Sequence, residues 1–304
     1  TLFDHIGLAV GEYAGREKIP FVKLAAGTNA HVWEQGNPYS FRTGHTNYLQ
    51  AKALATEAAK LPIKKWATVA PNYEYGQSMV ASFREFLSEL RPDVEWVGEY
   101  WPEALNLEAG PIVQALLRDK PEGIFVMVFG PDVVELHREG EKRNLFNNKA
   151  IFAPTIGYPE ELRTLGANIP INWVTSAYPY ETLEHSGSKQ FLTAFRKKFQ
   201  KDPSFGALHG YIGLKFLATA IQQAGSTNAD AISNALKGIT IDSPVGPLTM
   251  RAIDNHPNIG VWIGETAVEN DRAYVKNIVF NSAEDLLPSD ETILNLKSNT
   301  SRQE

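Results

Sequence analysis

Several features that define common classes of protein are missing from this sequence of 304 residues. It has no cysteine, which excludes disulfide bonds, thiolate metal sites and cysteine redox chemistry. Its most apolar stretch, Ile124–Phe129, has the length of a strand, whereas crossing a bilayer takes about 20 residues. No charged and then apolar leader begins at Thr1, so we expect that any secretion signal has been removed or never existed.

Clustered positive charge and catalytic motifs are also missing. The net charge is −6 and Lys and Arg are scattered among acids, which argues against a nucleic-acid partner. None of the motifs G-x-G-x-x-G, G-x-x-x-x-G-K-[ST] and G-x-S-x-G is present, and the seven histidines lack metal-ligand spacing. We therefore expect neither enzymatic activity nor a metal or other cofactor.

The sequence does contain a regular alternation of short apolar segments and helical patterns, which is typical of α/β proteins with a largely parallel sheet. The expected strands are Phe21–Leu24, a segment ending near Phe41-Arg42, Trp66–Ala70, Val94–Tyr100, Ile124–Phe129, Ala150–Ala153, Asn172–Ala177, Pro247–Met250, Ile259–Glu265 and Tyr274–Phe280. Hydrophobic residues make up 43% of the chain, enough for a globular core.

Helical patterns separate or follow these strands. The expected helices are Asp4–Lys18, with Ile6, Val10, Tyr13 and Ala14 on one face, Tyr48–Lys60, Gln190–Phe199, Ala207–Ala224 and a segment capped by Thr227 or Asn228 and ending at Gly238. Residues 295–304 show no periodicity, and we expect them to fray. Because the chain starts inside a helix with no strand before it, we expect either that the central strands of the first lobe come from elsewhere or that an N-terminal piece is missing.

The most informative turn is Pro71–Gly76, which joins the strand Trp66–Ala70 to an amphipathic helix. Such strand-to-helix turns lie at the carboxyl end of a parallel sheet, where open α/β folds bind ligands. Phe129-Gly130-Pro131 and Pro154–Gly157 are turns of the same kind. With no catalytic group beside them, they predict a protein that holds a small molecule without transforming it.

Three segments of the chain resemble periplasmic binding proteins of type I, the substrate-binding family of branched-chain amino acid ABC transporters. The segments are IPFVKLAAGTNAHVWEQGNPYSFR, VAPNYEYGQSMVASFREFL and SPVGPLTMRAIDNHPNIGVWIGET. Their order and spacing match the family along nearly the whole chain. The resemblance implies two Rossmann-like, doubly wound lobes joined by a hinge, with the first lobe incomplete at its N-terminus.

Carried onto this sequence, the family architecture implies lobe 1 at residues 1–61 and 182–254. Lobe 2 would comprise residues 62–181 and 255–292, and residues 293–304 would form a C-terminal tail. The ligand would be clamped between the lobes, and hinge closure would be the expected motion.

The resemblance also implies site residues. Ala26, Gly27 and Thr28 would bind a carboxylate through main-chain N–H groups and a hydroxyl, with an ordinary tight turn as the alternative. Tyr75 would close over the ligand, with helix packing as its alternative. Phe129 and Tyr178 would line the pocket, with roles in the core and in hinge packing as alternatives.

Thr155 stands where family members that bind α-amino acids carry an acidic residue for the ligand ammonium. The turn here reads Ala-Pro-Thr-Ile-Gly and has no carboxylate. A buried ammonium without a counter-charge costs several kcal/mol. We therefore expect a ligand without a free α-amino group, such as a carboxylate, an aromatic acid or an amide.

The function that the resemblance implies is that of a periplasmic solute-binding component of an ABC importer, with the transporter's membrane permease as partner and no membrane insertion of its own. A cytoplasmic small-molecule sensor on the same fold is the alternative, and an enzyme is the third possibility.

Overall fold

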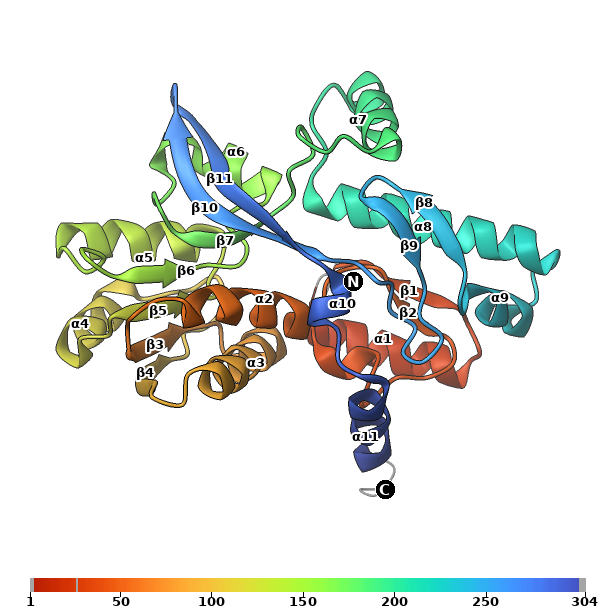
Figure 1. Cartoon of the computed structure of the whole chain (residues 1–304), viewed down its shortest axis with the longest axis horizontal. Helices are drawn as coiled ribbons and strands as arrows, with labels where there is room; N and C mark the ends of the chain where they lie inside the picture. The colour runs from red at the N-terminus through yellow and green to blue at the C-terminus, as the bar shows by residue number, and fades with distance from the viewer. Residues whose placement is uncertain (1–2, 26, 301–304) are drawn as a thin grey trace. The chain divides into compact units, whose positions relative to one another are not determined.

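The computed structural model describes residues 3–25 and 27–300 (Figure 1). Contacts divide the chain into two compact units. Unit 1 comprises Thr1–Thr46, Pro179–Gly260 and Ser282–Glu304, and unit 2 comprises Asn47–Tyr178 and Val261–Asn281.

These units differ from the predicted lobes mainly in the helix α2 (Asn47–Ala59), which the prediction placed in lobe 1. α2 packs on the helix α3 (Glu74–Leu90) and on strands of the unit 2 sheet, so its buried apolar face belongs to unit 2. Residues 282–292 were predicted in lobe 2 but group with unit 1.

Unit 2 is built on a seven-stranded sheet with the order β11-β10-β7-β6-β5-β3-β4. β3 to β7 run parallel, whereas β10 is antiparallel to both β7 and β11. The strands are β3 Lys65–Val69, β4 Glu95–Tyr100, β5 Gly123–Val126, β6 Ala150–Phe152, β7 Val174–Ala177, β10 Val261–Glu269 and β11 Arg272–Asn281. This mixed, doubly wound sheet confirms the predicted α/β class.

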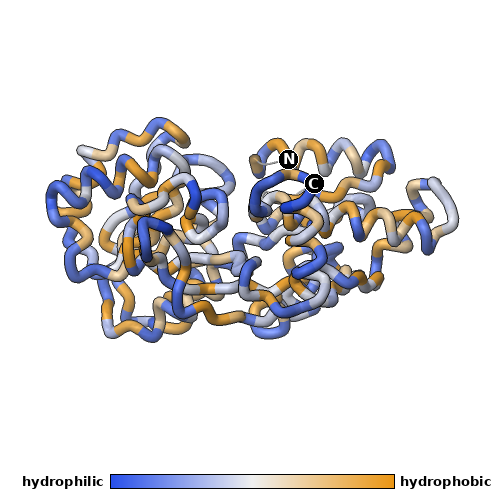
Figure 2. Tube along the Cα trace, turned by 90° about the horizontal axis from the view of Figure 1, so that it is seen from above, coloured by the Kyte–Doolittle hydropathy of each residue, from blue (hydrophilic) through white to orange (hydrophobic). Residues whose placement is uncertain are grey.

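Helices cover both faces of this sheet, as buried parallel strands require (Figure 1). Besides α2 and α3, they are α4 Ala109–Asp119, α5 Pro131–Lys142 and α6 Pro159–Leu165, followed by the short 3-10 helix η2 Gly166–Asn168. Hydrophobic and hydrophilic residues alternate along the trace of the helices (Figure 2), and such amphipathic patterns bury one face of each helix.

The face of the sheet under α3 has an aromatic core. Phe83 of α3 stacks on Phe125 of β5 with ring centroids 4.0 Å apart and planes within 4°. Trp66 of β3 meets the edge of Phe83 at 5.7 Å and lies 5.5 Å from Phe152 of β6. These rings come from three neighbouring strands and one helix, so they lock the strand order in place.

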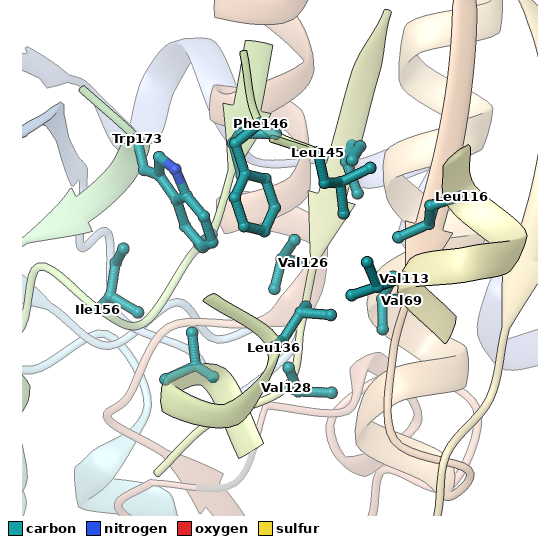
Figure 3. Packing of buried hydrophobic residues seen from close by; sticks show 14 of the residues in the cluster. Val69, Val113, Leu116, Val126, Val128, Leu136, Leu145, Phe146, Ile156 and Trp173 are labelled. Atoms are coloured by element: carbon teal, nitrogen blue, oxygen red, sulfur yellow. The ribbon is translucent and has the colours of Figure 1, made fainter. Parts of the chain in front are cut away.

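The opposite face carries an aliphatic core, in which Val69, Val126 and Ile151 of the strands pack against α4 and α5 (Figure 3). Val113 and Leu116 of α4 and Leu136 of α5 supply the helical side of the cluster, and Phe146 and Trp173 close one end. Alternation along each strand sends successive side chains to these two cores.

Unit 1 is built differently. Its parallel pairing, within the described part of the chain, joins β1 Phe21–Lys23 to β2 Ser40–Arg42, and a hairpin pairs β8 Thr240–Ser243 with β9 Gly246–Thr249. The helices are α1 Asp4–Arg16, η1 Asn29–His31 (a 3-10 turn), α7 Ser186–Phe199, α8 Phe205–Ala224, α9 Ala229–Leu236, α10 Ala283–Leu286 and α11 Asp290–Thr300. β8 lies in a segment for which no strand was predicted.

In unit 1, residues that favour helix ends in the sequence do lie at the ends of helices. Gly225 ends α8 in the left-handed conformation at φ 58°, as its C-terminal position predicts. The Asn228 side chain caps α9 by accepting the N–H of Ala231 at 3.1 Å. The prediction of an unstructured tail is wrong for residues 295–300, because α11 runs to Thr300 and is anchored by the fully buried Ile293.

Burial in α1 departs from its sequence pattern. The helix forms as predicted, but Ile6 is 43% exposed and Tyr13 is 51% exposed, while Asp4, Gly7 and Gly11 are buried beside Ala14. The small side chains let α1 approach β2 closely, since a Cβ on Gly11 would stand 3.2 Å from Ser40 Oγ. Among the described helices of either unit, none has the length and apolarity to cross a bilayer.

Candidate functional site

The sheet of unit 2 has a topological switch point. The chain passes from β3 to β4 on one side of β3 and then returns to β5 on the other side. In open α/β sheets, ligands bind outside the carboxyl ends of the strands at such a reversal. Tyr75 lies in the first turn of α3, which follows β3, and Phe129 lies in the loop after β5, so the topology brings these two predicted site residues to the switch point.

Tyr75 and Phe129 form an aromatic pair there. Their ring centroids lie 6.4 Å apart at an interplanar angle of 70°, an edge-to-face arrangement. Both side chains are half-buried, so Phe129 is not the core residue that its alternative interpretation proposed. Tyr73 lies 6.1 Å from Tyr75, ring to ring, and extends the aromatic surface.

The Tyr75 turn is fixed by its neighbours. Gly76 is required because a Cβ there would stand 2.1 Å from the carbonyl oxygen of Pro71. Asn47, the first residue of α2, donates its side-chain amide to the Tyr75 carbonyl at 3.3 Å. Sequence reasoning missed Asn47, because the two residues are 28 positions apart and only the packing of α2 on α3 joins them.

Phe129 is placed by a second special turn. Gly130 has φ 57° and is followed by Pro131 at the first position of α5. That left-handed conformation suits glycine, and proline is favoured at the start of a helix. The loop therefore ends β5 abruptly at Val126, three residues before the predicted strand end.

The turn after β6 contains Thr155, whose side chain is half-buried. The Thr155 carbonyl accepts the N–H of Tyr158 at 3.2 Å, which closes the turn. The Tyr158 hydroxyl is buried and accepts a hydrogen bond from the Gln50 amide of α2, and burial raises the pKa of Tyr158. Tyr158 and Gln50 are polar groups at this edge of the sheet that sequence reasoning missed.

Tyr178 follows β7, so the four turns reach the same sheet edge in the order Tyr178, Thr155, Phe129 and Tyr75. The Tyr178 side chain is buried at 3% exposure. Burial of this kind fits its alternative role in packing, and its contact with a ligand stays a prediction.

The predicted carboxylate loop of unit 1 follows β1. Ala26 lies outside the described residues, and Gly27 and Thr28 are buried. The Thr28 carbonyl accepts a hydrogen bond from the Arg42 guanidinium at the end of β2. The loop is therefore fastened through its main chain to the neighbouring strand, an arrangement that sequence reasoning did not foresee.

His45, in the loop that follows β2, is buried at 5% exposure. Its Nε2 contacts the Gly260 carbonyl at 2.9 Å, and its ring lies 5.4 Å from that of His209. His209 Nδ1 contacts the Thr43 carbonyl at 2.8 Å, and His256 Nε2 contacts the Gly44 carbonyl at 3.1 Å. A carbonyl can only accept, so each of these nitrogens carries the proton.

All three imidazoles are neutral, because burial lowers the pKa of His45 to about 4 and that of His209 to about 3. Burial also holds the pKa of His256 well below its usual value, and the charge of Arg42 adds to the effect. The three rings thus fix the main chain that follows β2 without adding charge.

Two open grooves of about 450 and 580 Å³ lie beside β4 in unit 2 and share Glu99 and Trp101 in their linings. None of the predicted site residues lines either groove. No group of three or more histidine, aspartate or glutamate side chains within the described residues is arranged to hold a metal ion.

The described residues form an α/β fold in which the candidate site residues follow the carboxyl ends of the strands. The family model of the periplasmic binding proteins matches residues 2–272, and the chain belongs to that family. A curated relative, the Leu/Ile/Val-binding protein homolog 6 of Brucella melitensis, is 23% identical over 278 residues, which cover 90% of this chain and 70% of the relative.

Solved structures show the same fold. A solute-binding protein of an ABC transporter from Rhodopseudomonas palustris BisB5, in complex with 3,4-dihydroxybenzoic acid, has a TM-score of 0.82 at 24% identity and covers 93% of this chain and 77% of its own. Another solute-binding protein of an ABC transporter, from Rhodopseudomonas palustris HaA2 in complex with p-hydroxybenzoic acid, has a TM-score of 0.85 at 18% identity. The match covers 97% of this chain and 79% of that protein's chain.

Proposed function

We propose that this protein is the solute-binding component of an ABC importer. It would work in the periplasm, bind a small ligand and deliver it to the transporter's membrane permease. Family membership supports the general role. The ligand class that we propose is an aromatic carboxylate, with amide-type ligands as the nearest variant.

The observation that carries this proposal is the Tyr75–Phe129 pair at the switch point of unit 2. Two half-buried rings in edge-to-face contact leave ring surface available for an aromatic ligand, and stacking between rings is worth about 1 kcal/mol beyond burial. We expect the main-chain N–H groups of Gly27 and Thr28, in unit 1, to bind a carboxylate.

The Thr155 turn supports a ligand without an α-ammonium group, because residues 153–158 contain no carboxylate. The carboxylates next in sequence are Glu160 and Glu161, in the first turn of α6. Burial raises the pKa of Glu161, and the charge of Glu160 adds to that rise.

The proposal is tested by isothermal titration of the whole chain with 4-hydroxybenzoate and, separately, with leucine. We expect 4-hydroxybenzoate to bind at micromolar concentration or tighter and leucine to bind at least tenfold more weakly. Leucine binding at micromolar affinity would overturn the ligand class, and the name of the Brucella relative makes that the outcome to watch.

The matched variants are Tyr75→Ala and Tyr73→Ala, two neighbouring tyrosines of one turn. Losing the Tyr75 ring should weaken 4-hydroxybenzoate binding about tenfold or more, since 1.4 kcal/mol corresponds to tenfold. Tyr73→Ala should change the affinity less than threefold. Equal losses in the two variants would remove Tyr75 from the site, and turnover of any probe would overturn the binding function itself.

A further inference from the structure

Arg42 is the most unusual charged residue of unit 1, because its side chain is fully buried and, among the residues that the structure describes, no carboxylate is hydrogen-bonded to it. Within the described residues, its guanidinium donates to two main-chain carbonyls, those of Thr28 and of His45, the latter at 3.3 Å. Its Nε has no hydrogen-bond partner in the described part of the chain. A buried guanidinium normally forms a bidentate pair with a carboxylate.

The two carbonyls lie in different loops. Lys23 and Arg42 are register partners at the ends of the parallel strands β1 and β2. Thr28 follows β1 and His45 follows β2, so both loops leave the carboxyl edge of the same strand pair. The single guanidinium therefore ties together the two loops at this edge.

The guanidinium keeps its charge despite burial. Desolvation lowers the pKa of Arg42 to about 10, while the charges of Asp4 and Asp254 partly restore it, so the group is protonated at neutral pH. Asp4 Oδ1 lies 3.6 Å from Lys23 Nζ, and Asp254 contacts Arg251 at 3.4 Å. The surrounding acids are thus engaged with other cations.

The neighbouring imidazoles add no positive charge. His31 and His256 both have a lowered pKa, for which burial is the largest cause and the charge of Arg42 a further one. His45 and His209, which hold the same loop, are neutral for the same reason of burial. The permanent charge under the two loops is therefore that of Arg42, with Lys23 paired to Asp4 beside it.

We propose that Arg42 makes unit 1 select a carboxylate, as a positioning residue that fixes the Thr28 and His45 loops and as a buried positive charge beneath them. The inference rests on the proposed function, and it names Arg42 as the specificity determinant of that site. The loops would contact the ligand, and Arg42 would act through them. Neutral ligands of the same shape would gain from the fixed loops but not from the charge.

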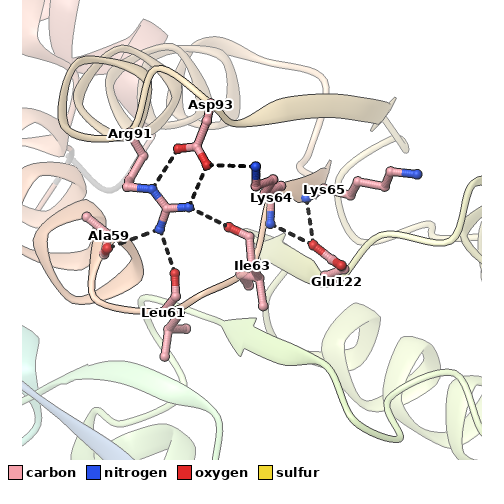
Figure 4. Close-up of polar contacts among 8 residues, drawn as sticks. All are labelled: Ala59, Leu61, Ile63, Lys64, Lys65, Arg91, Asp93 and Glu122. Atoms are coloured by element: carbon pink, nitrogen blue, oxygen red, sulfur yellow. Dashed lines mark hydrogen bonds and ion pairs between the residues drawn. The ribbon is translucent and has the colours of Figure 1, made fainter.

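Unit 2 offers a matched control in Arg91, which also fastens loops through main-chain carbonyls (Figure 4). Its guanidinium donates to the carbonyls of Ala59, Leu61 and Ile63 at 3.3, 2.6 and 3.3 Å. It differs in pairing with the Asp93 carboxylate at 2.7 Å and in lying before the amino ends of β3 and β4. Arg91→Gln therefore removes a loop-fastening arginine away from the carboxyl edge.

The experiment measures the affinity of the whole chain for 4-hydroxybenzoate and divides it by the affinity for the neutral 4-hydroxybenzamide. Arg42→Gln should lower the ratio about tenfold, as expected for one unit charge acting over several ångströms in a protein. Arg42→Lys keeps the charge but not the two-loop fork, so it should weaken both ligands similarly and preserve the ratio. Arg91→Gln should leave the ratio unchanged.

Amide hydrogen exchange without ligand tests the positioning role independently. Gly27, Thr28 and Gly44 to Thr46 should exchange at least tenfold faster in Arg42→Lys than in the wild type, and Arg91→Gln should leave them unchanged. An unaltered affinity ratio in a folded Arg42→Gln chain, or unaltered exchange in Arg42→Lys, would overturn the inference. If Arg42→Gln does not fold, Arg42→Lys tests the charge role, because it retains the charge. If Arg42→Lys lowers the affinity ratio as much as Thr28→Ala, which alters the loop alone, the charge role is overturned.

Failure of the proposed function gives a different result. If the wild type binds neither 4-hydroxybenzoate nor 4-hydroxybenzamide, the aromatic carboxylate is the wrong ligand class and the selective role of Arg42 falls with it. The exchange measurement then still decides whether Arg42 fixes the two loops.

Discussion

The interiors of the two units differ in the kind of side chain that they bury. Unit 2 buries aromatic and aliphatic side chains on both faces of its seven-stranded sheet, with Phe83 and Phe125 in face-to-face contact. Unit 1 buries Lys23 and Arg42 at 0% exposure, together with Asp4 and a set of neutral imidazoles. An apolar interior is stabilised by the area it removes from water, whereas a buried polar interior is stable only while each charge keeps its partner.

The largest effect should come from the aromatic core of unit 2. Phe125→Ala removes one ring of the stacked pair and leaves a cavity that the surrounding strands cannot close, at a cost of about 4 kcal/mol in the free energy of unfolding. Urea unfolding, followed by amide exchange in β3, β5 and β6, measures it. A cost below about 1 kcal/mol would mean that the core is loosely packed.

The ion pair of unit 1 gives the complementary test. Asp4→Leu leaves the Lys23 ammonium buried beside an apolar side chain and should cost about 3 kcal/mol. The double variant Asp4→Leu with Lys23→Met removes both charges and should cost clearly less than Asp4→Leu alone. If the double variant costs the sum of the two single variants, the two charges are not coupled and the comparison of the units fails.

Acid should weaken unit 1 more than unit 2. In the unfolded chain a histidine has a pKa near 6.5, whereas burial lowers it to about 4 for His45 and about 3 for His209. Because the folded pKa is the lower one, the unfolded state binds more protons below pH 6.5. The stabilisation is complete above that pH and is lost as pH falls from about 6.5 toward 4.

The expected loss is about 1 kcal/mol per pH unit for each of these histidines between pH 6 and 5. The measurement is the urea midpoint of the whole chain, with amide exchange assigning the loss to unit 1. The triple variant His45→Gln, His209→Asn and His256→Gln keeps an N–H for each carbonyl and cannot titrate, so its midpoint should depend less on pH. A pH dependence as steep as that of the wild type would contradict the role of the buried imidazoles.

The smallest effect should come from charge on the surface of unit 2. Arg138 and Glu135 of α5 form an exposed pair at 2.6 Å, three residues apart. Arg138→Ala should change the free energy of unfolding by about 0.5 kcal/mol or less, because exposed pairs are solvated and screened by salt. A change of several kcal/mol would show that exposed and buried charge do not differ here as we argue.

Much of unit 2 could be predicted from the sequence. The parallel strands β3, β5 and β6 are short and mostly apolar, and turn residues such as Gly130-Pro131 follow them, so their positions could be predicted from the sequence. Tyr75 and Phe129 could also be predicted as site residues, because each follows a predicted strand. That the two rings meet depends on β3 pairing with β5, which the order of the chain alone does not state.

Unit 1 was harder to predict for a physical reason. The apolar pattern of α1 predicts a buried face with Ile6 and Tyr13, yet the packed face in the described structure carries Asp4 and Gly11. A lone histidine after a strand is usually solvated, yet His45 is buried because the distant residues His209 and Gly260 enclose it. Neither the packed face of α1 nor the burial of His45 can be predicted from the residues next to them in the sequence.

By itself, the sequence determined the α/β class, the turns that carry the candidate site and the absence of cysteine chemistry, because periodicity and turn residues act over a few positions. The tertiary structure alone decided that α2 packs within unit 2, that Asn47 holds the Tyr75 turn and that Arg42 joins the Thr28 and His45 loops. These contacts join residues far apart along the chain, or residues whose proximity depends on strand pairing. Burial and electrostatics follow distance in space, and only folding fixes that distance.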